Sequence, residues 1–162
     1  KKIKETAPSD WSLLEKFSKN LIDHHEGVPG YEEKKGSRVE EIFNKLPSDR
    51  ILERLNWSIY DSPELFQPVG SKPEVTMKRK DIRDLYLRVE RQTIRKLPDQ
   101  GSIVFTVRVH VDPLLSISKE HDLLDDLNLA IASLPQEMKE YKAIDQIEKE
   151  VTNWIQENKK IK

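Results

Sequence analysis

The stretch LYLRVERQT, residues 85–93, decides the fold, because its apolar and polar side chains alternate as they do in a half-buried β-strand. Side chains of a strand alternate with period two, so Leu85, Leu87 and Val89 share one face. Arg91 falls on that same apolar face. A guanidinium keeps its proton in a protein, and burying it without a partner costs several kcal/mol. We therefore expect Arg91 to meet a carboxylate, a bound anion or a polar ligand.

The neighbouring charges suggest a structural alternative for this arginine. Glu53 lies in another predicted strand and can form a buried ion pair with Arg91, which would then need no ligand. Arg88, Arg95 and Lys96 are predicted to form an ordinary solvated face.

Three segments have the composition of β-strands: residues 51–60, 85–97 and 102–111. The turn sequence PDQG, residues 98–101, joins the last two as a hairpin. In the third strand, Thr106, Arg108 and His110 are predicted to face away from the core. The residues predicted to face the core are Ile103, Phe105, Val107, Val109 and Val111.

Helices are predicted around this sheet. Apolar spacing indicates helices over residues 11–25, 37–46 and 118–134, and a last helix that begins at Pro135 and runs past Ile155. Residues 67–83 are polar, with two prolines and a glycine, and indicate a loop. The pattern predicts an α+β fold in one domain over residues 1–162. Three strands are few for so many helices, so we expect either further strands upstream or a reduced version of a larger fold.

The composition excludes several classes of protein. Charged residues are 35% of the chain and the net charge is −1, which gives no overall electrostatic footprint for nucleic acid or an anionic membrane. No stretch approaches the roughly 20 apolar residues of a membrane span. The chain has no cysteine, so disulfides, zinc–thiolate sites and iron–sulfur ligation are excluded. An intracellular, cytoplasmic location is consistent with these features.

The histidines are the strongest candidates for metal ligands. His24 and His25 end the first predicted helix, and helical spacing alone does not choose between them. Neutral imidazole is a good ligand for haem iron. The structural alternative is that they cap the helix C-terminus. His110 and His121 are predicted to lie on the surface.

Five ordered blocks of the sequence resemble one known family. They are residues 8–16, 21–31, 56–66, 87–98 and 103–114. The first three are similar to the family patterns FPSxW…EK, LxxIHxPVPGY and NWSxxDSPELF. The last two are similar to LRVERQTLRRLP and FTIRTYVDPL. This order and spacing resemble the haem-dependent oxidative N-demethylase alpha subunit, or HRQ, family over residues 8–114, with residues 115–162 as C-terminal helices.

The resemblance implies a PAS-like antiparallel sheet flanked by helices that binds haem b. It implies oxidation of a small secondary amine, dimethylamine, with oxygen as co-substrate. The electrons would come from a partner reductase that carries flavin and an iron–sulfur centre. The alternative function is a non-catalytic haem- or ligand-binding module, or a degenerate remnant.

The resemblance also suggests roles for two residues. The histidine of the family's IHxPVP pattern falls on His25, which is the expected axial ligand of the haem iron. Gly27 stands where the family has the first proline. The arginine of the VERQT pattern falls on Arg91, which is expected to act in catalysis and cofactor binding, either in an oxygen-binding pocket or at a haem propionate.

Overall fold

The structure is a computed structural model, and it describes residue 29 and residues 36–66, 81–98 and 102–160. Its centre is a three-stranded antiparallel sheet in the order β1-β2-β3. The strands are β1 (Ile51–Tyr60), β2 (Tyr86–Lys96) and β3 (Ile103–Pro113). The predicted α+β class is confirmed, and so are the three strands to within two residues at each end.

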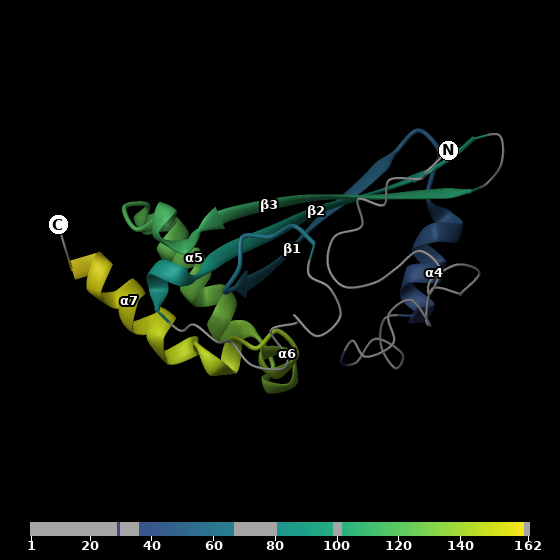
Figure 1. The fold of residues 1–162 in the computed structure, drawn as a ribbon. Helices are drawn as coiled ribbons and strands as arrows, with labels where there is room; N and C mark the ends of the chain where they lie inside the picture. The colour runs from purple at the N-terminus through teal and green to yellow at the C-terminus, as the bar shows by residue number, and fades with distance from the viewer. Residues whose placement is uncertain (1–28, 30–35, 67–80, 99–101, 161–162) are drawn as a thin grey trace.

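In the described part of the chain, four α-helices accompany the sheet: α4 (Gly36–Lys45), α5 (His121–Ser133), α6 (Gln136–Tyr141) and α7 (Glu148–Lys160). Short 3-10 turns lie between them: η1 (Ile82–Asp84), η2 (Leu114–Ile117) and η3 (Ile144–Gln146). Figure 1 shows α5, α6 and α7 gathered at one end of the sheet and α4 at the other. No helix among the described residues is both long and apolar enough to cross a membrane.

The strand register gives the sheet two faces of different character. Arg91 pairs with Leu55 and Arg108, whereas Arg88 pairs with Ser58 and Val111. Paired residues project to the same side of a sheet. The Arg91 face consists of Ile51, Glu53, Leu55, Trp57, Ile59, Leu87, Val89, Arg91, Thr93, Arg95, Val104, Thr106, Arg108, His110 and Asp112. The Arg88 face consists of Leu52, Arg54, Asn56, Ser58, Tyr60, Tyr86, Arg88, Glu90, Gln92, Ile94, Lys96, Ile103, Phe105, Val107, Val109, Val111 and Pro113.

The hydrophobic core lies at the end of the sheet that carries α5 and α7. Ile59, Leu85 and Leu114 are fully buried there, and Trp57 and Leu87 pack against the same cluster. The helices complete the core with Leu124, Leu127, Ile131, Ile144, Ile147, Val151, Trp154 and Ile155. We call this the near end of the sheet, and the opposite end, with Ile51, Lys96 and Ile103, the far end. The helical layer therefore covers only part of the Arg91 face.

Three predictions differ from the structure. The predicted core-facing side of the third strand is wrong, because the hairpin register puts Ile103, Phe105, Val107, Val109 and Val111 on the Arg88 face, whereas the core packs against Ile59 and Leu87 of the Arg91 face. The last helix is interrupted into α6, η3 and α7, because Ala143 adopts left-handed backbone geometry with φ of 54°. Residues 82 and 83, predicted as the end of a loop, belong to η1. The predicted helix over residues 11–25 and the loop segment 67–80 lie outside the described residues.

Candidate functional site

The buried guanidinium of this sheet belongs to Arg88, which the sequence predicted to be solvated. Arg88 is 2% exposed, and its two terminal nitrogens donate to the backbone oxygens of Glu64 and Leu65 at 3.3 and 3.0 Å. Its guanidinium carbon lies 5.4 Å from the ring centre of Tyr60, within cation–π range. Its Nε is buried and has no hydrogen-bond partner among the described residues. Leaving such a donor unpaired costs roughly 1–3 kcal/mol.

The predicted interior position of Arg91 is wrong. Its side chain is 50% exposed and forms an ion pair with Glu53, which is itself 44% exposed. The partner predicted for the structural alternative is therefore correct, but the pair is not buried. The physical reason is the length of the helical layer, which ends at Trp57 and Ile59 and leaves Arg91 beyond it.

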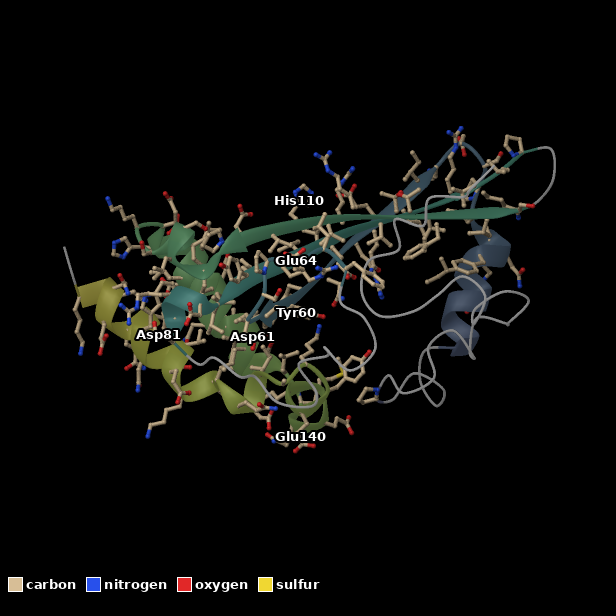
Figure 2. The ribbon with its side chains drawn as sticks, in the orientation of Figure 1. Tyr60, Asp61, Glu64, Asp81, His110 and Glu140 are labelled. Carbon is tan, nitrogen blue, oxygen red and sulfur yellow. The ribbon has the colours of Figure 1, made fainter. Side chains whose placement is uncertain are left out.

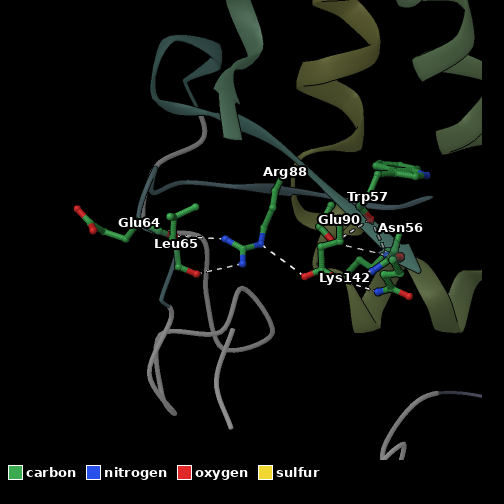
Figure 3. A network of polar contacts seen from close by, with 9 residues as sticks. Asn56, Trp57, Glu64, Leu65, Arg88, Glu90 and Lys142 are labelled. Carbon is green, nitrogen blue, oxygen red and sulfur yellow. Dashed lines mark hydrogen bonds and ion pairs between the residues drawn. The ribbon is translucent and has the colours of Figure 1, made fainter. Parts of the chain in front are cut away.

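The carboxylate of Glu90 lies at the centre of a polar network on the Arg88 face (Figure 3). Gln92 and Asn56 donate side-chain amide hydrogens to its Oε2 at 3.0 and 3.4 Å. Its other oxygen, Oε1, lies 3.8 Å from the unpaired Nε of Arg88. Glu90 is 16% exposed, so this carboxylate is largely removed from water. One of its oxygens is held by amides, and the other faces a buried cation.

Two cations hold the amides in place behind Glu90. Arg54 Nε donates to Gln92 Oε1 at 2.6 Å, which leaves the Gln92 amide nitrogen to donate to the carboxylate. Lys142 Nζ donates to Asn56 Oδ1 at 3.1 Å and to the backbone oxygen of Trp57 at 2.6 Å. Each amide therefore accepts from a cation and donates to the anion, an arrangement that fixes the side-chain orientation of both amides.

Burial determines the protonation behaviour of the lysine in this network. Burial lowers the pKa of Lys142, the nearby Glu90 carboxylate opposes this effect, and the Arg54 guanidinium adds to it. The lysine Nζ also lies 5.8 Å from the centre of the Trp57 ring.

The network can bind a small polar or cationic group. A carboxylate with one oxygen saturated by amide donors presents the other oxygen to an ammonium or to a proton donor. The adjacent Arg88 can stabilise negative charge, because a desolvated guanidinium interacts more strongly than one in water. Val107, Val109 and Val111 are partly buried on the same face and supply apolar surface beside these polar groups.

The two candidate iron ligands, His24 and His25, lie outside the described residues, so their placement stays a prediction. His110 and His121 are exposed, as predicted. Within the ranges that the structure describes, no group of three histidine, aspartate or glutamate side chains is close enough to hold a metal ion.

The sequence was also compared with models of known protein families. A family model described as haem-dependent oxidative N-demethylase, alpha subunit-like, matches residues 5–152. The chain belongs to this family. The match covers the strands that carry Arg88, Glu90 and Gln92, and it extends through Lys142 to α7. In this demethylase-like chain, the polar network and the family match therefore occupy the same elements.

The sequence reasoning missed Arg88, Glu90, Gln92 and Lys142 as site residues. A signal for the first three was present in the hairpin, because a turn centred between Asp99 and Gln100 pairs Lys96 with Ile103. That register places the polar residues of β2 opposite the valines of β3, on a face that is half apolar. No local signal identified Lys142, since its role depends on a contact with β1 some 85 residues earlier in the chain.

Proposed function

We propose that this chain is a haem-binding, PAS-like oxidoreductase subunit that demethylates a small amine such as dimethylamine. The observation that carries the proposal is the buried guanidinium of Arg88, whose Nε has no hydrogen-bond partner among the described residues and lies 3.8 Å from Glu90 Oε1. A buried donor without a hydrogen bond needs a physical explanation, and a bound group that completes its hydrogen bonding is one. The family match supplies the reaction class.

The residues of the Arg88 face fit a wall of a haem pocket. Such pockets combine apolar lining with a few fixed polar groups, and here partly buried valines adjoin one carboxylate and one guanidinium. His25 would hold the iron, as the family resemblance implies. Haem, when bound, supplies the binding and activation of oxygen. Substrate binding and charge stabilisation are assigned to side chains of this chain.

The overall reaction balances as dimethylamine, oxygen, two electrons and two protons giving methylamine, formaldehyde and water. At neutral pH the substrate is a cation, and Oε1 of Glu90, which lies 3.8 Å from Arg88 Nε, would bind and orient it. Arg88 would supply a fixed positive charge beside the reacting groups. The amide pair Gln92 and Asn56 keeps the Glu90 carboxylate in one orientation.

We therefore assign the role of the guanidinium in an oxygen-binding pocket to Arg88 and not to Arg91. The two arginines project to opposite faces of β2, so only one of them can line a pocket on a given face. A guanidinium removed from water interacts more strongly with a bound group than one in water, and Arg91 is half exposed. A contact between Arg91 and a haem propionate remains the competing prediction, and the variants below separate the two.

The first test measures haem binding and turnover. Protein expressed with a haem precursor should show a Soret band, which His25→Ala removes and the matched control His24→Ala retains. Supplied with a reductase and NADPH, the parent should release formaldehyde and methylamine from dimethylamine in equal amounts. A Soret band without formaldehyde would indicate a non-catalytic haem module instead.

The second test compares the two arginines. We expect Arg88→Leu to retain the Soret band and lower the demethylation rate by about 10-fold or more, because an electrostatic contact to the reacting centre is lost. At a saturating concentration of reductase, Arg91→Leu should change that rate by less than about 2-fold, as expected of a surface ion pair. The opposite ranking would restore Arg91 as the functional guanidinium and refute our assignment of Arg88.

A further inference from the structure

The far half of the Arg91 face is a solvent-exposed surface rich in arginine. Arg91 and Arg108 lie directly opposite each other on β2 and β3, and Arg95 lies on the same face two pairs farther along. All three are exposed. His110 projects from the same face, and Figure 2 shows it on the side of the sheet away from Tyr60 and Glu64.

Within the part of the chain that the structure describes, the positive charges on this surface are not balanced by carboxylates. Glu53 pairs with Arg91, but no carboxylate of a described residue forms an ion pair with Arg95 or Arg108. Like charges that are direct cross-strand neighbours destabilise a sheet by a few tenths of a kcal/mol up to about 1 kcal/mol. Since the whole chain has a net charge of −1, this arginine surface is a local concentration of positive charge. Two arginines held opposite each other despite this cost favour a role for the surface in binding anions.

Exposed apolar side chains border the arginines on both edges of the sheet. Leu55 is 64% exposed and Ile51 60% exposed on β1, and Val104 is also exposed on β3. Protein interfaces are enriched in arginine and combine it with apolar contacts, whereas glutamate and lysine are depleted there. This composition favours a protein partner over a small anion.

We propose that the far half of the Arg91 face docks an acidic protein surface, and that this partner is the electron donor. The second part rests on the proposed function, because the balanced reaction consumes two electrons that the amine and oxygen do not provide. Electron-transfer partners bind through small, charge-complementary interfaces that form and separate quickly. An open sheet surface with fixed arginines suits such an encounter, since long-range attraction raises the association rate.

The same surface does not suit single-stranded nucleic acid. Proteins that bind single strands stack bases on aromatic side chains. None of the nine positions on the far half of this face is aromatic: they are Ile51, Glu53, Leu55, Arg91, Thr93, Arg95, Val104, Thr106 and Arg108.

The test is binding of an acidic plant-type [2Fe–2S] ferredoxin to the full chain, measured by calorimetry or by NMR titration at low ionic strength. We expect the double variant Arg95→Glu and Arg108→Glu to weaken binding by about 10-fold or more, because it reverses two charges at the interface. Lys149→Glu is the matched control, since this exposed lysine lies on α7 and should change the affinity by less than about 2-fold. Raising the salt concentration should weaken binding to the parent.

The outcomes are distinct from those that test the demethylase proposal, because ferredoxin binding is measured without turnover. Equal affinity of the parent and the double variant would refute the docking surface, even if haem and demethylation were found. Absence of ferredoxin binding at low salt, together with binding of an oligothymidylate, would assign the surface to nucleic acid instead. Arginine-dependent ferredoxin binding by a chain without demethylase activity would support the docking surface and leave the donor role refuted.

Discussion

At the scale of single residues, the ammonium group of Lys142 contacts the edge strand β1. Its Nζ lies within hydrogen-bond distance of Asn56, the Trp57 backbone oxygen and Ser58 on the edge strand β1. These contacts give a backbone oxygen of the edge strand a hydrogen-bond donor, and they attach the α6 segment to the sheet. The cost is desolvation of a positive charge, which lowers the pKa of the lysine.

This lowered pKa predicts an alkaline dependence of stability. Between the lowered pKa of folded Lys142 and the usual value of 10.5, the unfolded chain binds more protons than the folded chain. The free energy of unfolding contributed by Lys142 therefore rises with pH across that window, and the desolvation cost is fully present below it. We expect the destabilisation caused by Lys142→Met, measured by urea unfolding, to be larger at pH 10 than at pH 7.5. Lys149→Met, the exposed control, should show no such change, and an equal response of the two variants would contradict a lowered pKa at Lys142.

Arg88 and Arg91 of β2 show what alternation can and cannot determine. The alternation itself was correct, because Leu87, Val89 and Arg91 do share a face. The error was to assume that this face stays buried along its whole length. A helical layer shorter than the sheet packs against Leu87 and leaves Arg91 in solvent. The length of that layer depends on tertiary packing, which no local pattern reports.

At the scale of elements, the break between α6 and α7 is set by one buried alanine. Ala143 has φ of 54° and is fully buried, and η3 and α7 follow it directly. Lys139 and Glu148 form an ion pair across the break at 2.6 Å. Apolar residues from Met138 to Ile155 keep helical spacing throughout, so periodicity alone predicted one helix. Neither glycine nor proline marks the turn, because core packing imposes the left-handed geometry on an ordinary residue.

Substitution of this alanine tests that account. Ala143→Val should lower the free energy of unfolding by about 2 kcal/mol or more, because a β-branched residue fits neither the left-handed backbone nor the packed core. Ala132→Val, on the exposed side of α5, should cost less than about 1 kcal/mol. Ala143→Gly, which accepts positive φ but loses a buried methyl group, should fall between them. Similar costs for the two valine variants, measured by chemical denaturation, would show that the geometry at Ala143 is not a constraint.

At the scale of the whole molecule, the two ends of the sheet lie in different environments. Its near end is part of the core with α5 and α7, and its far end carries exposed Ile51, Leu55 and Phe105. The three strands and the helices α4 and α5 could be predicted because they depend on local periodicity. The position of the helical layer along the sheet could not, and the same property decides which side chains are site residues.

This difference along the sheet predicts a gradient of hydrogen exchange within a single strand. β2 is the central strand and is paired on both sides from Tyr86 to Arg95, so hydrogen bonding alone predicts uniform protection. Local opening costs more where helices cover the strand, and we expect the amide of Leu87 to exchange at least about 10-fold more slowly than that of Arg95. NMR-detected exchange measures this directly, and uniform protection would mean that the far end is as firmly held as the core. Addition of the acidic ferredoxin should then slow exchange in the far half of β2 alone. The near half is the internal control, because the helices already determine its protection.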